Sequence, residues 1–512
     1  MGYQSIQLKM PPGYSEEQLR SRVGKTLRIR NFSFQIDNKS LDARNKPNVH
    51  WQLKVGVSSP EIKEGEAPVT RTLDIPFKKR KFPVVVVGSG PAGFFSAFVL
   101  QKAGFSVTLI ERGSEVKTRS QAVAHFERTG FFDRKNNYAF GEGGAGTFSD
   151  GKLTSRSKHI SAEKGFIISS YIKAGAPAEI EYLAYPHLGT DNLRKIVRNL
   201  RIFFEDMGGK VMFETLLEDI VVKDSKVTTA ATSAGDLDCG ALFIAPGHSA
   251  YETYRMLMRR GVPFRTKNFA LGSRMEHPQE IINHAQWGHK QLPGVKAAEY
   301  RLTSQADGNH PVFSFCMCPG GIVVPAAAYQ DTNIVNGMSF YRRNGHYANA
   351  ACVAGLHPGD LAGREVSPLE ALELVENLER SFFSYTGDYR APACSITDFL
   401  DRSLRTSSFE TSYPLGLLAS PLWEMLPLGI VKSLQAGLTD FIRKIRGFEN
   451  GNLLGLESKT SSPVQVLRQP SGKCEGFENL YIMGEGSGYA GGIISSAADG
   501  IKTAMNFIQG TT

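Results

Sequence analysis

An apolar run, a glycine turn and a helical pattern follow one another directly from residue 84. Val84–Val87 is apolar throughout, Phe94–Ala103 has a helical pattern, and Ser106–Ile110 is a second apolar run that closes at Glu111. The motif Gly88-x-Gly90-x-x-Gly93 lies between the first run and the helix. This order forms a βαβ unit, which is the context that a dinucleotide-binding fingerprint requires. The pattern therefore predicts a dinucleotide site at this turn.

Each part of the fingerprint has a physical role. The first glycine allows a tight turn, the second lets the backbone approach a pyrophosphate, and the third lets helix and strand pack closely. The N-terminus of the helix offers free N–H groups and a positive dipole end to the phosphates. Glu111 stands where a carboxylate accepts hydrogen bonds from ribose hydroxyls. The residues predicted to hold the cofactor here are Gly88, Ser89, Gly90, Pro91, Ala92, Gly93, Glu111 and Arg112.

A second match, Gly141-x-Gly143-x-x-Gly146, has neither an apolar strand before it nor a helical pattern after it. It belongs to the glycine-rich stretch Phe140–Lys152, whose backbone freedom is costly unless the stretch wraps around something. We interpret it as a loop against the cofactor and not as a second dinucleotide turn. The cofactor contacts predicted from this region are Arg119, Gly143, Gly144, Gly146, Thr147 and Lys152.

The C-terminal segment contains another strand and glycine loop. Leu480–Met483 is a short apolar run, Gly484–Gly492 a glycine loop, and Ile493–Ile508 a helical pattern. A helix N-terminus aimed at a flavin stabilises the negative charge that builds up on reduction. This loop, paired with the distant fingerprint, favours FAD over NAD, and the absence of an attachment motif favours non-covalent FAD. The further contacts predicted are Ala245, Pro246, Gly247, Gly484, Glu485, Gly491, Gly492 and Ile493.

The first 82 residues predict a separate small domain and a linker. Residues 1–60 contain strand patterns, a helix from Ser15 to about Leu27 and a polar turn at 39–44, which together indicate a small α+β domain of the ferredoxin-like kind. Residues 61–82 are a linker that ends in the basic run 78–81. We interpret that run as a solvated lead-in to the next strand, with a nucleic-acid or targeting signal as the alternative.

The rest of the chain predicts an α/β fold with an insertion. Residues 83–265 and 446–512 are expected to form a Rossmann-type FAD-binding domain, and residues 266–445 an inserted α+β substrate or cap domain. The elements expected are a helix at 191–207, a strand at 210–213, a meander at 217–239, strands near 270–274, 297–302, 311–315 and 322–325, and helices near 368–384 and 427–445.

Composition adds constraints on partners and compartment. The chain has 512 residues, a net charge of +9 and six cysteines. A dinucleotide and a phosphorylated reductant would account for the charge, so a nucleic-acid partner is not expected. So few cysteines do not make a disulfide scaffold, and no signal peptide or membrane-spanning run is visible. We expect a soluble cytoplasmic protein.

Several longer motifs resemble a known family. They are KSLDAR with PNVHW at 39–51, FGEGGAGTFSDGKL at 140–153, APGHSA at 245–250, RMEHPQ at 274–279, SFCMCPGG at 314–321, NGMSF at 336–340, TSSPV at 460–464 and GEGSGYAGGI at 484–493. The chain is similar along nearly its whole length to the FAD-dependent dehydrogenases of unassigned substrate, also called the FAD-dependent protein C family. The resemblance implies a two-domain FAD fold of the glutathione-reductase-like superfamily. That superfamily usually has an aspartate where this chain has Glu485.

The pair Cys316-x-Cys318 is the sharpest candidate for chemistry beyond cofactor binding. On a strand the two thiols would share a face, where they could form an easily reduced disulfide, or one could face the flavin as nucleophile or acid. The alternative is that both pack as small hydrophobic residues. The remaining cysteines are scattered, so we expect no metal site.

Arg274, Glu276 and His277 cluster at the end of a predicted strand of the insertion. Arg274 and Glu276 could bind an anionic substrate or reductant while His277 acts as acid or base. The alternative is an ion pair beside a hydrogen-bonded histidine.

Together these patterns predict an FAD-dependent oxidoreductase that transfers a hydride between a small organic substrate and flavin, with NAD(P)H or a redox protein as its electron partner. One alternative is a flavin-dependent RNA-modifying enzyme that grips RNA with Phe32, Phe34, His50 and Trp51. Another is a redox sensor without turnover that uses Cys316 and Cys318. The sequence leaves the substrate, the electron donor and the oligomeric state open.

Overall fold

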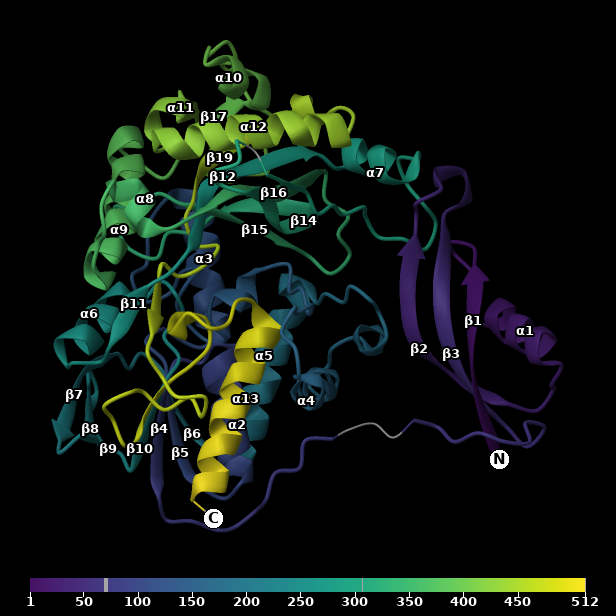
Figure 1. Ribbon diagram of the computed structural model, residues 1–512, viewed down its shortest axis with the longest axis horizontal. Coiled ribbons are helices and arrows are strands. Elements are labelled where there is room, and N and C mark those ends of the chain that lie inside the picture. Colours follow the sequence, from purple (N-terminus) through teal and green to yellow (C-terminus); the bar gives the residue numbers. More distant parts are fainter. Residues whose placement is uncertain (69–71, 306, 512) are drawn as a thin grey trace.

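The computed structural model describes residues 1–68, 72–305 and 307–511. Figure 1 shows a small N-terminal unit to one side, a lower layer built on a parallel sheet, and an upper layer built on a mixed sheet. The lower layer contains both the fingerprint and the C-terminal helix, so segments from the two ends of the chain lie side by side there.

The N-terminal unit is a three-stranded antiparallel sheet covered by one helix. Its strands are β1 (Gly2–Met10), β2 (Ser33–Asp42) and β3 (His50–Ser59), in the order β1-β3-β2, and its helix is α1 (Glu16–Leu27). Ser15 begins the helix with a capping box to Gln18, as its sequence favours. A ferredoxin-like fold needs two βαβ units, so that part of the prediction is wrong. The turn predicted at 39–44 is also partly wrong, because β2 continues through Asp42, where Leu41 pairs with Trp51.

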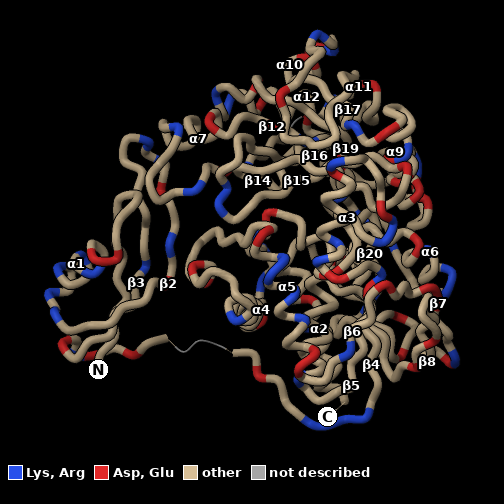
Figure 2. Tube along the Cα trace, turned by 180° about the vertical axis from the view of Figure 1, so that it is seen from behind, with Lys and Arg blue, Asp and Glu red and all other residues tan. Residues whose placement is uncertain are grey.

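The N-terminal unit is docked through the strand edge of β2. The Lys39 N–H donates to the Tyr182 carbonyl at 2.8 Å, and the Ala184 N–H donates to the Lys39 carbonyl at 3.0 Å. These partners follow the one-turn helix η3 (Ala178–Glu181). Residues 72–82 of the linker lead beneath the lower layer to the parallel sheet (Figure 1). Its basic run lies near the C-terminal end in Figure 2, where Arg80 donates to the Ala103 carbonyl at 2.7 Å.

The lower layer is a five-stranded parallel sheet in the order β21-β10-β4-β5-β6. Its strands are β4 (Pro83–Val87), β5 (Ser106–Ile110), β6 (Lys210–Met212), β10 (Ala241–Ile244) and β21 (Leu480–Ile482). The predicted βαβ unit is confirmed, with α2 (Pro91–Lys102) between β4 and β5. The meander is confirmed as β7 (Leu217–Lys223), β8 (Lys226–Thr232) and β9 (Gly235–Asp238).

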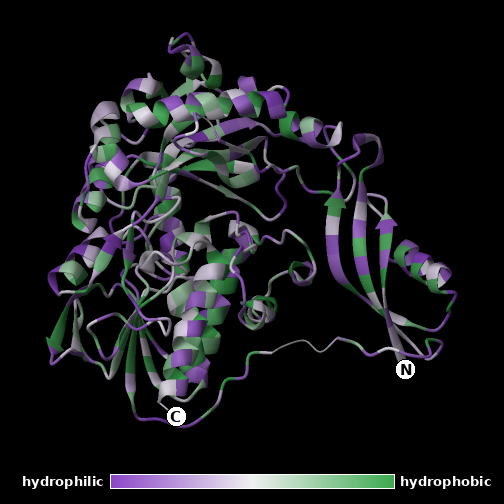
Figure 3. Cartoon of the chain, in the orientation of Figure 1, coloured by the Kyte–Doolittle hydropathy of each residue, from purple (hydrophilic) through white to green (hydrophobic). Residues whose placement is uncertain are grey.

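Apolar side chains on both faces of this sheet make two separate cores. On one face α2, α4 (Ser161–Lys173), α5 (Gly189–Asp206) and α13 (Ile493–Gly510) surround residues such as Phe95 and Phe243. On the other face the meander and α6 (Tyr251–Arg259) enclose residues such as Leu242 and Ile482. Figure 3 shows the corresponding hydrophobic colour of these strands and of the buried helix α2. Because both faces of the sheet are covered, the loops at the carboxyl ends of its strands are the part of this layer that can form a site.

The upper layer is a mixed sheet in the order β13-β14-β16-β12-β19-β17-β18, with β15 also paired to β14. Its long central strands are β12 (Phe269–Pro278), β14 (Val312–Pro325) and β16 (Tyr347–Leu356). The two strands predicted at 311–315 and 322–325 are one strand, β14, and residues 297–302 are not a strand. β19 (Asn452–Glu457) lies inside this sheet between β12 and β17, so the insertion extends beyond the predicted end at 445.

Helices cover the outer face of the upper sheet (Figure 1). The longest predicted ones are present as α9 (Pro368–Thr386) and α12 (Leu428–Lys444), and α12 packs its apolar residues Val431, Leu434 and Leu438 into the core of the upper layer. The remaining elements are α3 (Val116–Thr129), α7 (Gln279–Trp287), α8 (Pro358–Ala362), α10 (Ile396–Asp401), α11 (Leu422–Met425), β11 (Phe264–Thr266), β13 (Thr303–Ser304), β15 (Val335–Ser339), β17 (Ala391–Ser395), β18 (Leu417–Ala419), β20 (Val464–Val466), and the one-turn helices η1 (Lys46–Asn48), η2 (Ala145–Phe148), η4 (Phe448–Asn450) and η5 (Glu485–Ser487). Among the described residues, we find no helix long and apolar enough to cross a membrane.

The contact between α2 and α13 gives a test of this fold. A Cβ on Gly500 of α13 would lie 2.1 Å from the Ala92 carbonyl oxygen, whereas one on Gly510 would meet nothing within 4 Å. We expect Gly500→Ala to lower the free energy of unfolding by about 1–3 kcal/mol through overpacking. Gly510→Ala, at the end of the same helix, should be neutral or slightly stabilising. Urea unfolding followed by circular dichroism measures both, and equal stability of the two variants would contradict the predicted packing.

Candidate functional site

A cavity of about 270 Å³ lies where the carboxyl ends of the parallel strands meet the upper sheet. From the lower layer it is lined by Gly88, Gly90, Pro91, Ala92, Glu111, Arg112, Gly144, Gly146, Lys152, Ala245, Pro246, Gly247, Gly484, Glu485, Gly492 and Ile493, all of which the sequence predicts as cofactor contacts. From the upper sheet it is lined by Phe315, Cys316, Cys318, Asn336, Gly337, Glu457 and, just beyond β19, Lys459. One space thus joins the fingerprint to the insertion.

The fingerprint glycines have the geometry that their roles require. A Cβ on Gly93 would lie 1.9 Å from the Gly88 carbonyl oxygen, so only glycine lets α2 pack this closely on the turn. A Cβ on Gly90 would meet only the Gly144 Cα, at 3.8 Å. Because Gly90 lines the cavity, its missing side chain leaves backbone bare beside the α2 N-terminus. The second glycine-rich match crosses this turn and forms η2 instead of a strand and a helix.

Glu111 joins three of the loops around the cavity. One of its carboxylate oxygens accepts from the Ser89 N–H at 3.0 Å and from the Ser89 hydroxyl at 2.7 Å. The other accepts from the backbone N–H groups of Gly113 at 3.0 Å and Gly141 at 3.1 Å. The carboxylate therefore stands at the cavity wall already held in place by the backbone that surrounds it.

Arg119 holds the glycine-rich loop from behind and does not line the cavity. Its fully buried guanidinium donates to five carbonyl oxygens, those of Asn137, Tyr138, Gly141, Glu142 and Gly144, at 2.8–3.1 Å. Burial lowers the pKa of Arg119 to about 10, so the side chain stays charged at neutral pH. Ser89, Gly93, Gly143, Thr147 and Gly491 also lie outside the residues that line the cavity. Of these, Gly143 donates its N–H to the Ser89 hydroxyl at 3.2 Å, and the Thr147 hydroxyl donates to the Glu142 carbonyl at 3.1 Å.

The C-terminal loop closes the cavity opposite the fingerprint. Glu485 lies 3.3 Å from Nδ1 of His248, which follows the turn after β10. The Tyr254 hydroxyl on α6 bridges the two turns, at 3.1 Å from the Gly247 carbonyl oxygen and 2.9 Å from that of Gly486. His248 belongs to the APGHSA motif. It links the two turns because it lies beside Glu485, more than 200 residues away in the sequence.

The two cysteines of β14 differ sharply in exposure. Cys316 is exposed, although it lies deep in the molecule, because the cavity reaches it, whereas Cys318 is buried. Cys316 has a left-handed backbone (φ 42°) at a break in the register between β14 and β16. The Cys318 thiol contacts the Cys316 carbonyl oxygen at 3.2 Å. The protein atoms around the two thiols displace water, which raises the pKa of Cys316 to about 12 and raises that of Cys318, so both thiols hold their protons at neutral pH.

Arg274 holds this bulge from beneath. Its fully buried guanidinium donates to the Cys316 carbonyl oxygen at 2.9 Å and to a carboxylate oxygen of Glu457, also at 2.9 Å. Its Nε donates to the Asn349 side chain at 2.8 Å. The ionic partner of Arg274 is therefore Glu457 on β19 and not Glu276, whose carboxylate contacts Ser412.

Glu276 and His277 are not among the residues that line the cavity. The carboxylate of Glu276 accepts from the Ser412 N–H and hydroxyl. Nε2 of the fully buried His277 lies 2.8 Å from the Phe448 carbonyl oxygen, and burial lowers the pKa of His277 to about 4. The structure thus separates the predicted cluster, with Arg274 next to the cavity wall and the other two side chains in the upper core.

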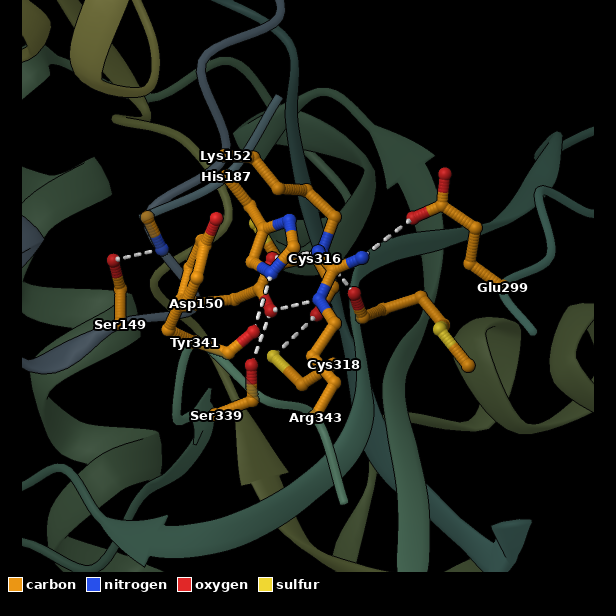
Figure 4. A network of polar contacts seen from close by, with 12 residues as sticks. Ser149, Asp150, Lys152, His187, Glu299, Cys316, Cys318, Ser339, Tyr341 and Arg343 are labelled. Atoms are coloured by element: carbon orange, nitrogen blue, oxygen red, sulfur yellow. Dashed lines mark hydrogen bonds and ion pairs between the residues drawn. The ribbon is translucent and has the colours of Figure 1, made fainter. Parts of the chain in front are cut away.

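A polar network beside the cysteines joins Lys152, a predicted cofactor contact, to Asp150, Arg343 and His187 (Figure 4). Lys152 donates to Asp150 at 2.7 Å and also to the Met317 carbonyl oxygen. Arg343, from the loop after β15, binds Asp150 with two nitrogens at 3.0 and 2.6 Å. Burial by itself would raise the pKa of Asp150, but the neighbouring cations Lys152 and Arg343 hold that pKa below its usual range. Burial, with Arg343 nearby, lowers the pKa of His187 to about 3, so His187 is neutral at neutral pH.

The cavity fits a flavin dinucleotide. Gly90, Gly247 and Gly492 line it with space where a side chain would stand, which lets a ligand touch backbone. The N-termini of α2 and α13 both border it, and each offers free N–H groups to anionic atoms. Carboxylates stand at Glu111 and Glu485, where hydroxyl groups of a nucleotide or ribityl chain would find acceptors. Among the described residues we find no cluster that could hold a metal ion.

This combination of parallel sheet, glycine turns and shared cavity defines a Rossmann-type FAD-binding flavoprotein. Residues 81–129 match an FAD binding domain, residues 268–460 match the family of FAD-dependent protein, C-terminal domain-like, and residues 3–58 match a domain of unknown function. The chain is 40% identical over 498 residues to an uncharacterized protein of Clostridium beijerinckii, covering 93% of this chain and 92% of the other. The chain belongs to the family of that protein, an FAD-dependent family. These matches support the predicted class of FAD-dependent oxidoreductase; the placement among glutathione-reductase-like flavoproteins stays a prediction.

Solved structures give a weaker likeness. A flavoprotein/dehydrogenase from Cytophaga hutchinsonii is 12% identical with a TM-score of 0.38, covering 84% of this chain and 79% of the other. L-proline dehydrogenase from P. horikoshii is 12% identical with a TM-score of 0.35, covering 85% of this chain and 95% of the other. Likeness at this level carries no argument about the reaction.

The buried histidine gives a pH prediction. The unfolded chain binds a proton at His277 below about pH 6.5, whereas the folded protein, with a pKa of about 4, does not. Stability contributed by the neutral form is therefore present above pH 6.5 and lost as the pH falls toward 4. From pH 6.5 to pH 5 this single group should cost about 2 kcal/mol.

We expect His277→Gln to flatten this dependence, because an amide can donate to the Phe448 carbonyl and does not titrate. Urea unfolding at pH 7.5 and pH 5.0 measures it, with exposed His289→Gln as the matched control. If His277→Gln lost as much stability as the wild type, the burial of a neutral His277 would be contradicted.

Proposed function

We propose that this protein is an FAD-dependent oxidoreductase that exchanges a hydride with a small organic substrate bound between the two layers. The observation that carries the proposal is the single cavity, which runs from the fingerprint turn to the thiol of Cys316 on the upper sheet. Bound FAD supplies hydride exchange at its isoalloxazine ring. The chain itself binds and orients the cofactor and the substrate, and it excludes water from them.

The lower layer is proposed to bind the cofactor through backbone more than through side chains. The bare turns at Gly90 and Gly247 admit close contact, and the α2 N-terminus favours the pyrophosphate. The α13 N-terminus, which begins at Ile493, is proposed to favour the negative charge that develops on reduction.

The upper sheet is proposed to present the substrate. Of the five predicted catalytic residues, Cys316 alone faces the open cavity with an exposed side chain, and its thiol keeps a proton that it can give. Arg274 is proposed as a positioning residue, because it binds the carbonyl of Cys316 and not the cavity contents. We propose structural roles for Cys318, Glu276 and His277.

Neither alternative function gains support. In the N-terminal unit Phe32, Phe34 and Trp51 pack against the core of that unit, and the Arg20 guanidinium stacks on both phenylalanines. They are therefore engaged within the domain. A thiol switch works through a thiolate, and burial disfavours the thiolate at both Cys316 and Cys318.

An anaerobic titration tests the proposal directly. We expect purified protein to contain FAD, and its absorption band to bleach with NADPH, NADH or a reduced redox protein and to recover with an oxidised acceptor. Reduction only by an organic substrate would still support an oxidoreductase of the dehydrogenase or oxidase kind. A folded protein that stays colourless after reconstitution with FAD would refute the proposal.

A variant at the fingerprint separates cofactor binding from folding. Gly90 has an ordinary backbone (φ −65°), and a Cβ there would meet only the Gly144 Cα, at 3.8 Å. Gly90→Leu should therefore fold but fill the cofactor's space, reducing bound FAD more than tenfold, roughly the effect of losing 1.4 kcal/mol or more of binding. Exposed Gly429→Ala in α12 is the control. Normal FAD content in Gly90→Leu, measured by absorption after gel filtration, would contradict the assigned position of the cofactor.

A further inference from the structure

The end of the cavity next to the upper sheet has the chemistry of a substrate site. We name it the cap-side subsite and define it by Lys152, Cys316, Cys318 and Asn336, which all line the cavity. We propose that the cap-side subsite binds a small substrate through a carboxylate, which pairs with Lys152 and lies beside the Cys316 thiol. This inference rests on the proposed function and names the class of its substrate.

The ammonium group of Lys152 can donate to one more partner. Its ammonium donates to Asp150 at 2.7 Å and to the Met317 carbonyl oxygen. An ammonium has three N–H donors, so one remains. The side chain lines the cavity and is 26% exposed, so an acceptor in the cavity can reach that donor. The two existing bonds fix the nitrogen, and a carboxylate pairing with it would not have to order a flexible chain.

Lys152 shares its carboxylate partner with a second cation, so its ammonium can pair with a further anion. Asp150 is one carboxylate shared by two cations, Lys152 and Arg343. Glu299 approaches Arg343 from the side away from Asp150, at the longer distance of 3.6 Å (Figure 4). His187 is neutral and adds no charge. Glu457, which lines the cavity from the upper sheet, is already paired with Arg274 at 2.9 Å.

Cys316 is aimed at the same space by its backbone. Its left-handed φ of 42° is unusual for a residue with a side chain, and such strain persists only where the surroundings impose it. Here the contact that holds this backbone is the hydrogen bond from the Arg274 guanidinium to the Cys316 carbonyl oxygen. Bulges of this kind re-aim side chains next to functional sites. Of the six cysteines, only Cys316 is exposed.

The test compares two alkylating reagents of nearly equal size, anionic iodoacetate and neutral iodoacetamide. In both reactions the Cys316 sulfur gives its proton to the buffer, forms a bond to the methylene carbon and expels iodide. Rates at Cys316 are measured on the FAD-loaded protein by peptide mass spectrometry. We expect the ratio of the iodoacetate rate to the iodoacetamide rate to fall about tenfold in Lys152→Met, the effect of removing one partly desolvated charge. Lys117→Met removes one exposed lysine charge outside the cavity and should keep the wild-type ratio.

A competition on the unaltered protein guards against a variant that fails to fold. Propionate should slow alkylation of Cys316 by iodoacetamide, and propionamide, its neutral counterpart, should not. Equal protection by both, or an equal reagent ratio in wild type and folded Lys152→Met, would overturn the subsite.

The flavin spectrum of the same samples distinguishes this failure from that of the proposed function. A yellow, reducible protein without the anion preference would refute only the subsite. A colourless protein that keeps the preference would refute the FAD assignment and leave the anion site standing.

Discussion

The structure depends on close backbone contact where side chains are missing. At the fingerprint, α2 approaches the turn so closely that a Cβ on Gly93 would lie 1.9 Å from the Gly88 carbonyl oxygen. The glycine-rich loop crosses the same turn, with Gly144 close to Gly90, and the loop before α13 meets α2 at Gly484 and Ala92. These crossings bring three distant segments to the carboxyl ends of the parallel strands. A cavity walled by backbone is the result.

The polar residues around the cavity have a different task, which is to hold these loops in place. Arg119 fixes the glycine-rich loop by its carbonyl groups, and Glu111 fixes it by its N–H groups. Both are buried charges, and a buried charge is tolerated only when its hydrogen-bonding capacity is met. Ordering a loop rich in glycine costs much conformational entropy, and the buried arginine and glutamate stabilise the ordered shape of the loop around the cavity.

Buried charges also hold part of the cavity wall in place in the upper sheet, where an ion pair lies beneath Cys316. Arg274 and Glu457 neutralise each other inside the sheet. Another N–H group of Arg274 donates to the carbonyl oxygen of Cys316, whose backbone is strained. The pair therefore connects the rigid strands β12 and β19 to Cys316, the exposed cysteine of the cavity wall. Lys152 and Asp150 come from the lower layer and Arg343 from the upper, so the two layers join at the site itself.

The sequence by itself determined the elements whose signals are local. The βαβ unit, the start of α1 at Ser15, the meander and the amphipathic helix α5 all follow from patterns within a few residues, and the structure contains them. The sequence also indicated most of the glycines that line the cavity, because a turn that must approach a ligand needs glycine whatever surrounds it. Only the tertiary structure decided which charges meet. Asp150 and Arg343 are 193 residues apart and Arg274 and Glu457 183 apart, and no local pattern links them. The bulge at Cys316 and the place of β19 in the upper sheet likewise depend on neighbouring strands, since register is fixed by pairing and not by one strand's own residues.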